Sequence, residues 1–292
     1  MKFLLVLVGA VCLVGGIHAQ TSTLGTTVSS AINISKNSLT TAIQQLNGTI
    51  NIADQSVSTA YTQFVQNMAA LYTSYYNRFS NYTTIDLSGL NQTICNLQNT
   101  MSPPQPIQDW STTQIFTDVQ ASAQQIESTL NAAVQTMTNS CAPPCANAAK
   151  VATCTTKWGP KLSTAPITID RITDCVTAEL VRFSDIGSNM ASMYNNLLTS
   201  ASNYLKVVDV CDTPAPEVLN NPSPMYGSPS TQCLNTYLQR ISYMPINSYV
   251  VDSMRYPQTY LIQFRVQRCA KLVELDVKDR VAKVLESFQS CL

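Results

Sequence analysis

Apolar side chains recur along the N-terminal part of this chain at alternating intervals of four and three residues. The series begins at Leu39 and continues through Ile43, Leu46, Ile50, Ala53, Val57, Ala60 and Phe64. An α-helix brings positions spaced in this way onto one side, where they form a seam that packs against a partner helix. Less regular apolar spacing continues to Tyr82. We therefore expect one long helix over about residues 22–81, and a break near Asn47-Gly48 is the alternative to a continuous one.

Three later segments show the same helical spacing, over about residues 112–139, 168–210 and 259–290. Prolines separate them, because a proline inside a helix removes a backbone hydrogen bond and clashes with the preceding turn. Residues 141–166 contain three cysteines and four prolines without any period, which predicts a loop stapled by disulfides. Residues 212–230 contain five prolines and predict an extended connector. The segment that follows is helical but interrupted at Pro245 and Pro257.

No segment alternates apolar and polar residues over a length that would compete as a strand. The predicted fold is all-α, an elongated bundle of long antiparallel, partly coiled-coil helices stapled by disulfides. We divide the chain into a signal peptide (1–19), a long glycosylated helix (20–102), a second helix with a Cys/Pro-rich loop (103–166), and a C-terminal helical region (167–292).

The first residues have the pattern of a secretory signal. Lys2 provides the positive start, an apolar run follows from Phe3 to Ile17, and Ala19 is a small residue suited to cleavage before Gln20. The run is too short for a membrane span, and no later stretch is long enough. The charged C-terminal end argues against a lipid-anchor signal. We therefore expect a secreted, extracellular protein without a membrane span.

Cysteine use agrees with an oxidising compartment. Nine cysteines remain once Cys12 is removed with the signal, and most should form disulfides outside the cell. The spacing of Cys141 and Cys145 differs from the C-x-x-C of thiol oxidoreductases, so we interpret the Cys-rich loop as structural. Because nine is odd, one thiol is either free or bonded to another chain. A disulfide-linked homodimer is one of these two alternatives.

The last cysteines are spaced as a repeat. Intervals of 36 and 22 residues separate Cys175, Cys211 and Cys233, and the same intervals lead on to Cys269 and Cys291. A 58-residue duplication (175–232 and 233–290) would explain this, with coincidence as the alternative. If the two copies fold as an antiparallel hairpin around the connector, Cys211 meets Cys233 and Cys175 approaches Cys269. We predict both bonds, and closing the 22-residue loop between Cys211 and Cys233 contributes about 3 kcal/mol.

Four N-glycosylation sequons occur, at Asn33, Asn47, Asn81 and Asn91, whereas proline excludes Asn221-Pro-Ser. Asn33 and Asn47 are two heptads apart, and each follows a residue of the apolar seam. They should therefore share an outward-leaning side of the helix, where sugar is tolerated.

Histidine is missing from the predicted mature chain, because His18 lies in the signal peptide. Without an imidazole, Ser-His-Asp and Cys-His hydrolases, zinc peptidases and proximal-His haem sites are excluded. Carboxylate catalysis remains as an alternative, but it needs two opposed acidic groups in a cleft. Charged residues make up only 12% of the chain and balance to zero, unlike a nucleic-acid binder. We expect no catalysis, no cofactor and no metal site.

Aromatic residues at helical spacing form a second group of candidates: Tyr72, Tyr75, Tyr76, Phe79 and Tyr82. They would serve either as a stacking platform for a sugar or apolar ligand, or as core, and we favour core. Met190 and Met193 pose the same choice between an adaptable pocket and core filling, and again we favour core.

The signal peptide, the low-charge Ser/Thr/Gln-rich helices and the cysteines spread along them resemble insect secreted proteins of the TsetseEP-domain type. The resemblance covers Cys95 to Cys291 at most. It implies an extracellular, often gut-associated protein, and it assigns no site residues. The favoured hypothesis is a non-catalytic glycoprotein that binds a protein or glycan partner. The alternative is a carrier of a small hydrophobic ligand held between helices.

Overall fold

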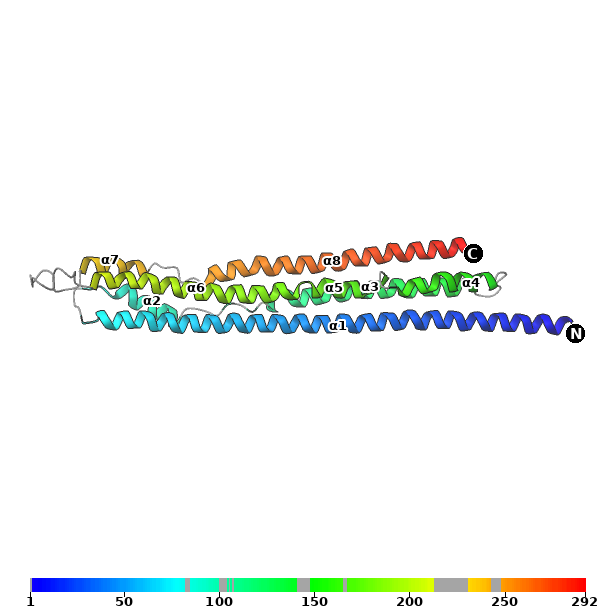
Figure 1. Cartoon of the computed structure of the whole chain (residues 1–292), viewed down its shortest axis with the longest axis horizontal. Coiled ribbons are helices and arrows are strands. Elements are labelled where there is room, and N and C mark those ends of the chain that lie inside the picture. Colours follow the sequence, from blue (N-terminus) through cyan, green and yellow to red (C-terminus); the bar gives the residue numbers. More distant parts are fainter. Residues whose placement is uncertain are drawn as a thin grey trace, which may run out of the picture. The chain divides into compact units, whose positions relative to one another are not determined.

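The structure is a computed structural model of the chain. It describes residues 2–81, 85–99, 104, 106, 108–140, 148–164, 167–212, 231–242 and 248–292 (Figure 1). The expected connector after Asp212, the predicted interruption at Pro245 and the side chain of Tyr82 lie outside the described residues.

All regular secondary structure in the described part of the chain is helical, so the all-α prediction is confirmed. The elements are α1 (Lys2–Phe79), α2 (Ser88–Asn99), α3 (Gln108–Asn139), α4 (Ala148–Trp158), the 3₁₀-helix η1 (Gly159–Ser163), α5 (Asp170–Thr177), α6 (Leu180–Asp212), α7 (Thr231–Ser242) and α8 (Ser248–Cys291). The apolar seam of α1 is buried as predicted, from Leu39 through Phe64, although Ile43 is only half-buried. Helix α1 continues without a break through Asn47-Gly48.

Helices α2 and α4 lie outside the helical segments expected from apolar spacing, and α2 shows that the predicted long helix of 20–102 is two helices. Residues 141–166 were predicted to be a loop, but α4 and η1 lie within them. The period of α4 is hidden because its buried side is formed by one valine and two small polar residues, Val151, Cys154 and Thr155. Helix α2 buries Leu90, Ile94 and Leu97, which have ordinary helical spacing. Asp86 caps its start by accepting a hydrogen bond from the backbone N–H of Ser88 at 2.9 Å.

Two further boundaries differ from the prediction. The helix expected over 168–210 is divided at Ala178 and Glu179, where the Glu179 N–H bonds to the Val176 carbonyl, three residues back instead of four. No proline or glycine marks this break. Conversely, α8 passes through Pro257, where an interruption was expected. Pro257 lies on an exposed side of the helix, where water can satisfy the carbonyl that loses its partner.

The described helices belong to two compact units, each assembled from separate stretches of chain. Unit 1 contains residues 1–49, 108–182 and 260–292, and unit 2 contains residues 50–107 and 183–259. Helices α1 and α8 each contribute one part to each unit. We describe the units separately.

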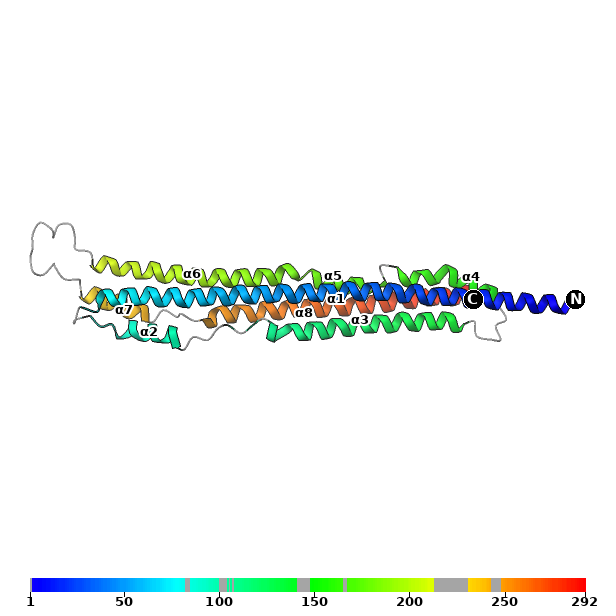
Figure 2. The same ribbon diagram turned by 90° about the horizontal axis from the view of Figure 1, so that it is seen from below.

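In unit 1 the start of α1, α3, α5 and most of α8 surround a core of aliphatic side chains. Helices α1 and α3 run antiparallel: Gly25 lies beside Val134, and Lys36 Nζ forms an ion pair with Glu127 Oε2 at 3.0 Å. Helix α8 has α3 along one side, where the Gln267 side-chain amide donates to Asp118, and α5 along the other, as Figure 2 shows. Buried residues include Val28, Ile32, Ile115, Ile126, Ile172, Val266 and Val277.

In unit 2 the second part of α1 packs against α6, and these two helices run parallel. Ala53 faces Gly187, whereas Arg78 lies further along both helices beside Asp209, at 2.6 Å. Parallel neighbours correct the expectation of antiparallel pairing for this pair, and the long intervening chain permits them. Helix α7 joins α6 and α2, and Asn235 Oδ1 accepts a hydrogen bond from the backbone N–H of Asp86.

Candidate functional site

The sequon asparagines lie on helix surfaces. Asn33 and Asn91 are exposed on α1 and α2, Asn81 is exposed just after α1, and Asn47 is half-buried. The preceding residues Ile32 and Leu46 face inward, 4% and 0% exposed, so Asn33 and Asn47 share the outward-leaning side that the spacing predicts. The hydroxyl-bearing residue of the first sequon, Ser35, is only 1% exposed. An enzyme that must reach this serine would have to act before α1 packs.

Three disulfides join the helices. Both bonds predicted from the cysteine spacing are present: Cys175–Cys269 in unit 1 and Cys211–Cys233 in unit 2, with Cα–Cα distances of 5.8 and 5.7 Å. A third bond, Cys154–Cys291, lies in unit 1 and was not predicted.

The signal for the third bond was nevertheless present. Cys154 precedes Cys175 by 21 residues, and Cys291 follows Cys269 by 22. Cys154 and Cys175 lie on α4 and α5, with η1 between them, and the nearly equal intervals on both sides of the Cys175–Cys269 bond still bring Cys154 opposite Cys291. The three bonds are thus nested in sequence around the segment after Cys211.

Among the residues that the structure describes, Cys95 is the free cysteine, and its side chain is exposed on α2. Cys141 and Cys145 are the remaining two cysteines of the predicted mature chain, and both lie outside the described residues.

The buried carboxylates of unit 1 are each held by two cations. Glu179, with its side chain 6% exposed, accepts two hydrogen bonds from Arg265 at 3.0 Å and one from Arg182. Glu274 accepts bonds from Lys271 and Lys278 at 2.9 and 2.8 Å. Burial would raise the pKa of Glu274, but hydrogen bonds from Lys278 and Lys271 bring it below its ordinary value. Both carboxylates are therefore acceptors in ion pairs that link side chains within unit 1.

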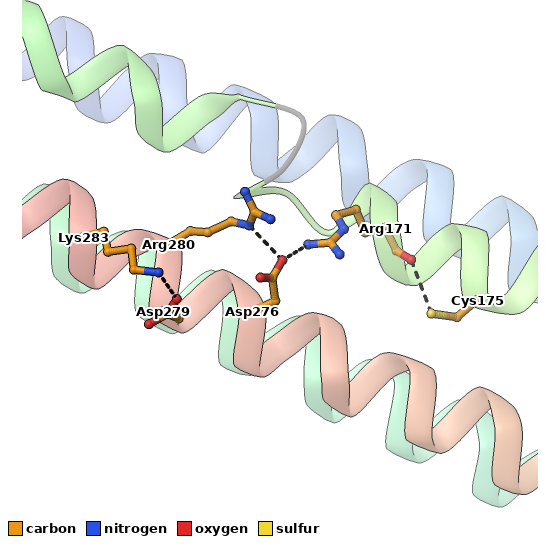
Figure 3. A network of polar contacts seen from close by, with 6 residues as sticks. All are labelled: Arg171, Cys175, Asp276, Asp279, Arg280 and Lys283. Carbon is orange, nitrogen blue, oxygen red and sulfur yellow. Dashed lines mark hydrogen bonds and ion pairs between the residues drawn. The ribbon is translucent and has the colours of Figure 1, made fainter.

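A third carboxylate links α8 to α5. Asp276 accepts hydrogen bonds from Arg280 at 2.8 Å and from Arg171 of α5, one turn before Cys175 (Figure 3). Hydrogen bonds from Arg280 and then Arg171 lower the pKa of Asp276 below its usual range. This ion-pair cluster and the Cys175–Cys269 disulfide fasten the same two helices.

The aromatic residues of α1 mostly form core. Tyr72 and Phe79 are fully buried, while Tyr75 and Tyr76 are half-buried. Burial raises the pKa of the Tyr72 phenol to about 12, and its hydroxyl has no hydrogen-bond partner among the described residues. Tyr75 instead donates to Asp209 at 3.3 Å. The preference for core over a stacking platform fits this burial.

The dominant aromatic contact of unit 2 involves a residue that the sequence analysis did not single out. Tyr194 of α6 is fully buried, and its ring centroid lies 5.6 Å from that of Tyr61 and 5.5 Å from that of Phe64. One turn before it, Met190 is 3% exposed, and Met193 is half-buried. The asparagines and serines around Tyr194 masked its inward position in the sequence.

Two open hollows are candidates for small-molecule contact. The first, in unit 2, has a volume of about 420 Å³. Its walls are Asp54, Gln55, Val57, Ser58, Pro104, Pro106 and the largely buried Arg255. The second, in unit 1, of about 460 Å³, lies beside the Cys154–Cys291 bond, where Lys157 stacks over the ring of Trp158 at 5.2 Å and Glu286 lines the opposite side.

Within the described residues, no three His, Cys, Asp or Glu side chains converge as a metal site would require. Among the helices that the structure describes, none has an apolar stretch long enough to cross a bilayer.

No protein-family model, curated protein or solved structure matches the chain.

Proposed function

We propose that this chain is a secreted, non-catalytic glycoprotein that acts by binding a protein or glycan partner through its helical surface. The proposal extends the resemblance to TsetseEP-domain proteins, which implies a gut-associated or other secretory fluid. The observation that carries it is the set of three disulfides between helices. Disulfides of this kind persist where the surroundings are oxidising, as they are outside the cell.

Two further features support the proposal. Three sequon asparagines are exposed, two on helices and one just after α1, so attached sugars would extend into solvent without disturbing the core. The buried carboxylates Glu179 and Glu274 are each committed to two cations within the fold. A glycosidase would instead need two opposed carboxyl groups that are available to substrate.

The exposed thiol of Cys95 gives the proposed disulfide-linked homodimer a definite bond. On a non-reducing gel, we expect a band of twice the chain mass that Cys95→Ser removes. A dimer band that persists in Cys95→Ser would place the bond elsewhere.

The central experiment is expression in a secreting eukaryotic cell. We expect the chain in the medium without residues 1–19, with a mass that falls after treatment with an N-glycosidase. Replacement of Asn33 and Asn91 by Gln should remove the corresponding glycans, and Asn221→Gln serves as the unmodified control. Retention in the cell, or a mass that the glycosidase leaves unchanged, would contradict the proposal.

The alternative function, a carrier of a small ligand with an apolar body, is favoured by the hollow beside Arg255. Val57 and the two prolines form an apolar wall there, and Arg255 would attract an acidic head group. Native mass spectrometry of the secreted chain distinguishes the two functions. A carrier retains a co-purified small molecule that Arg255→Met releases, whereas a surface-binding protein has the bare glycoprotein mass.

A further inference from the structure

Helix α8 has apolar side chains on two opposite sides. One side is buried against α3 and α5 and includes Ile262, Val266, Val273 and Val277. The other side is exposed and begins with Leu261 and ends with Asp279. We call this exposed set the α8 stripe; its members are Leu261, Phe264, Arg268, Leu272, Leu275 and Asp279.

Helical geometry places the α8 stripe on one narrow face. With 3.6 residues per turn, its six members fall within about 80° of one another, and the buried side lies roughly opposite. All of them belong to unit 1. The stripe is therefore a continuous feature of one helix and does not depend on how the two units are arranged.

The apolar members are large and substantially exposed. Leu261 is 50% exposed, Phe264 47%, Leu272 57% and Leu275 51%. Elsewhere in unit 1, exposed large apolar residues such as Ile34 and Val181 occur singly on their helices. Single exposed residues are normal in soluble proteins, but contiguous apolar rows mark surfaces that bind something.

The order of residues along the stripe identifies the occupant. Two leucines lie at its centre, a positive charge lies four residues before Leu272, and a negative charge lies four residues after Leu275. A second copy rotated about a two-fold axis between Val273 and Glu274 presents the segment from Arg268 to Asp279 in reverse order, whereas Leu261 and Phe264 face Glu286 and Lys283 of the second copy. Leu272 then meets Leu275 of the second copy, and Arg268 meets Asp279 of the second copy. A self-complementary patch of this kind defines an isologous dimer contact.

A parallel arrangement would instead place Arg268 of one copy beside Arg268 of the other, and the two Asp279 side chains beside each other. Like charges facing across an interface oppose association. We therefore propose that the part of the α8 stripe from Arg268 to Asp279 is the contact surface of an antiparallel homodimer, with a leucine centre and two symmetric Arg268–Asp279 ion pairs.

The charges at both ends can form these pairs. Among the described residues, Arg268 takes part in no ion pair or hydrogen bond of the structure. Asp279 bonds through Oδ2 to Lys283 at 2.6 Å, along α8 itself (Figure 3). Its other carboxylate oxygen can accept from Arg268 of a second copy, since a carboxylate accommodates several donors.

The contact is short, so the dimer should be weak. The self-complementary segment from Arg268 to Asp279 spans 12 residues, or about 16 Å of helix. Interfaces of this size lie at the low end of specific contacts and form reversibly with concentration. The inference does not rest on secretion, glycosylation or the Cys95 bond, and it requires only that unit 1 is folded.

The test is sedimentation velocity of the full chain carrying Cys95→Ser, which removes any covalent dimer through that thiol. Over about three orders of magnitude in concentration, we expect a monomer–dimer equilibrium. Arg268→Asp and Asp279→Arg should each weaken the dimer at least about tenfold, because each creates two like-charge contacts. Arg268→Asp combined with Asp279→Arg should restore it to within about threefold of the parent, because the charges are exchanged.

Matched controls separate docking from folding. Leu272→Asp with Leu275→Asp should abolish the dimer, while Val181→Asp, at an equally exposed single position, should leave it unchanged. Helical circular dichroism and the three disulfides are measured for every variant. The proposal is overturned if the parent stays monomeric throughout, if the leucine substitutions have no effect, or if the double charge exchange fails to restore association.

Discussion

The two units of this protein are built from the same kind of helix but held together differently. In unit 1, two disulfides and the Asp276 cluster join α8 to α4 and α5. In unit 2, one disulfide joins α6 to α7, and α1 and α6 are held by the Arg78–Asp209 ion pair and by the fit of their side chains, with Tyr194 between two aromatic rings and Gly187 against Ala53. Unit 1 thus has two covalent links between its helices and unit 2 has one.

The largest effect should come from the covalent link of unit 1. Cys175→Ala with Cys269→Ala should lower the free energy of unfolding of unit 1 by about 4 kcal/mol, because the unfolded chain gains entropy. Amide hydrogen exchange resolved by segment is the measurement. The matched variant, Cys211→Ala with Cys233→Ala, removes a bond that closes a shorter loop of 22 residues. It should lower the free energy of unfolding of unit 2 by about 3 kcal/mol. Equal loss of protection in both units from either variant would remove the distinction.

Alkaline pH should act on unit 2. The pKa of Tyr72 is about 12 in the folded chain and about 10 in the unfolded chain. The contribution of Tyr72 to the free energy of unfolding is therefore complete below pH 10. It is lost as the pH rises to about 12, which lowers that free energy by roughly 2–3 kcal/mol. Denaturant midpoints of the chain and of Tyr72→Phe, compared across this range, measure it. Parallel curves for the two proteins would show that Tyr72 is not the group responsible.

Two glycines provide an opposed pair of substitutions. A Cβ on Gly187 would lie 2.7 Å from Ala53 Cβ and 2.8 Å from Ala53 Cα. Backbone must therefore shift, and Gly187→Ala should destabilise unit 2 by about 1–2 kcal/mol despite its better helix propensity. Gly48 has nothing within 4 Å, so Gly48→Ala should stabilise by about 0.5–1 kcal/mol. Thermal unfolding of both variants is the measurement, and a stabilising Gly187→Ala would contradict the close packing.

The smallest effect should come from the surface charges of unit 1. Asp276→Asn removes an acceptor for Arg171 and Arg280 and should lower stability slightly at neutral pH. The pKa of Asp276 is lowered in the fold, so its contribution is present at neutral pH and lost as the pH falls through that lowered value. High salt should reduce the difference between the two proteins, which denaturant titration detects. A difference independent of salt would indicate lost packing instead.

The contrast between the units also explains what the sequence could predict. The apolar seams of α1, α3 and α8, and the bonds Cys175–Cys269 and Cys211–Cys233, follow from residue type and spacing alone. The intervals between the cysteines also indicated the Cys154–Cys291 bond. It was not predicted, because α4 was interpreted as a loop.

Other features depend on contacts between residues that are distant in the sequence, so the sequence shows no pattern for them. Glycine at position 187 matters only because Ala53, far away in the chain, lies against it. The break at Glu179 has no proline or glycine to announce it, and the carboxylate there is matched by Arg265, which is 86 residues away. The self-complementary order from Arg268 to Asp279 was present in the sequence, but it indicated a contact surface only once this side of α8 was found to be exposed.

The nesting of the three disulfides has a consequence for what happens when a protease cuts the chain. A single peptide-bond cut anywhere between Cys154 and Cys291 leaves the two fragments joined by at least one sulfur–sulfur bridge, and a cut between Cys211 and Cys233 leaves them joined by all three. A single proteolytic cut within this stretch would therefore leave both fragments covalently attached to each other.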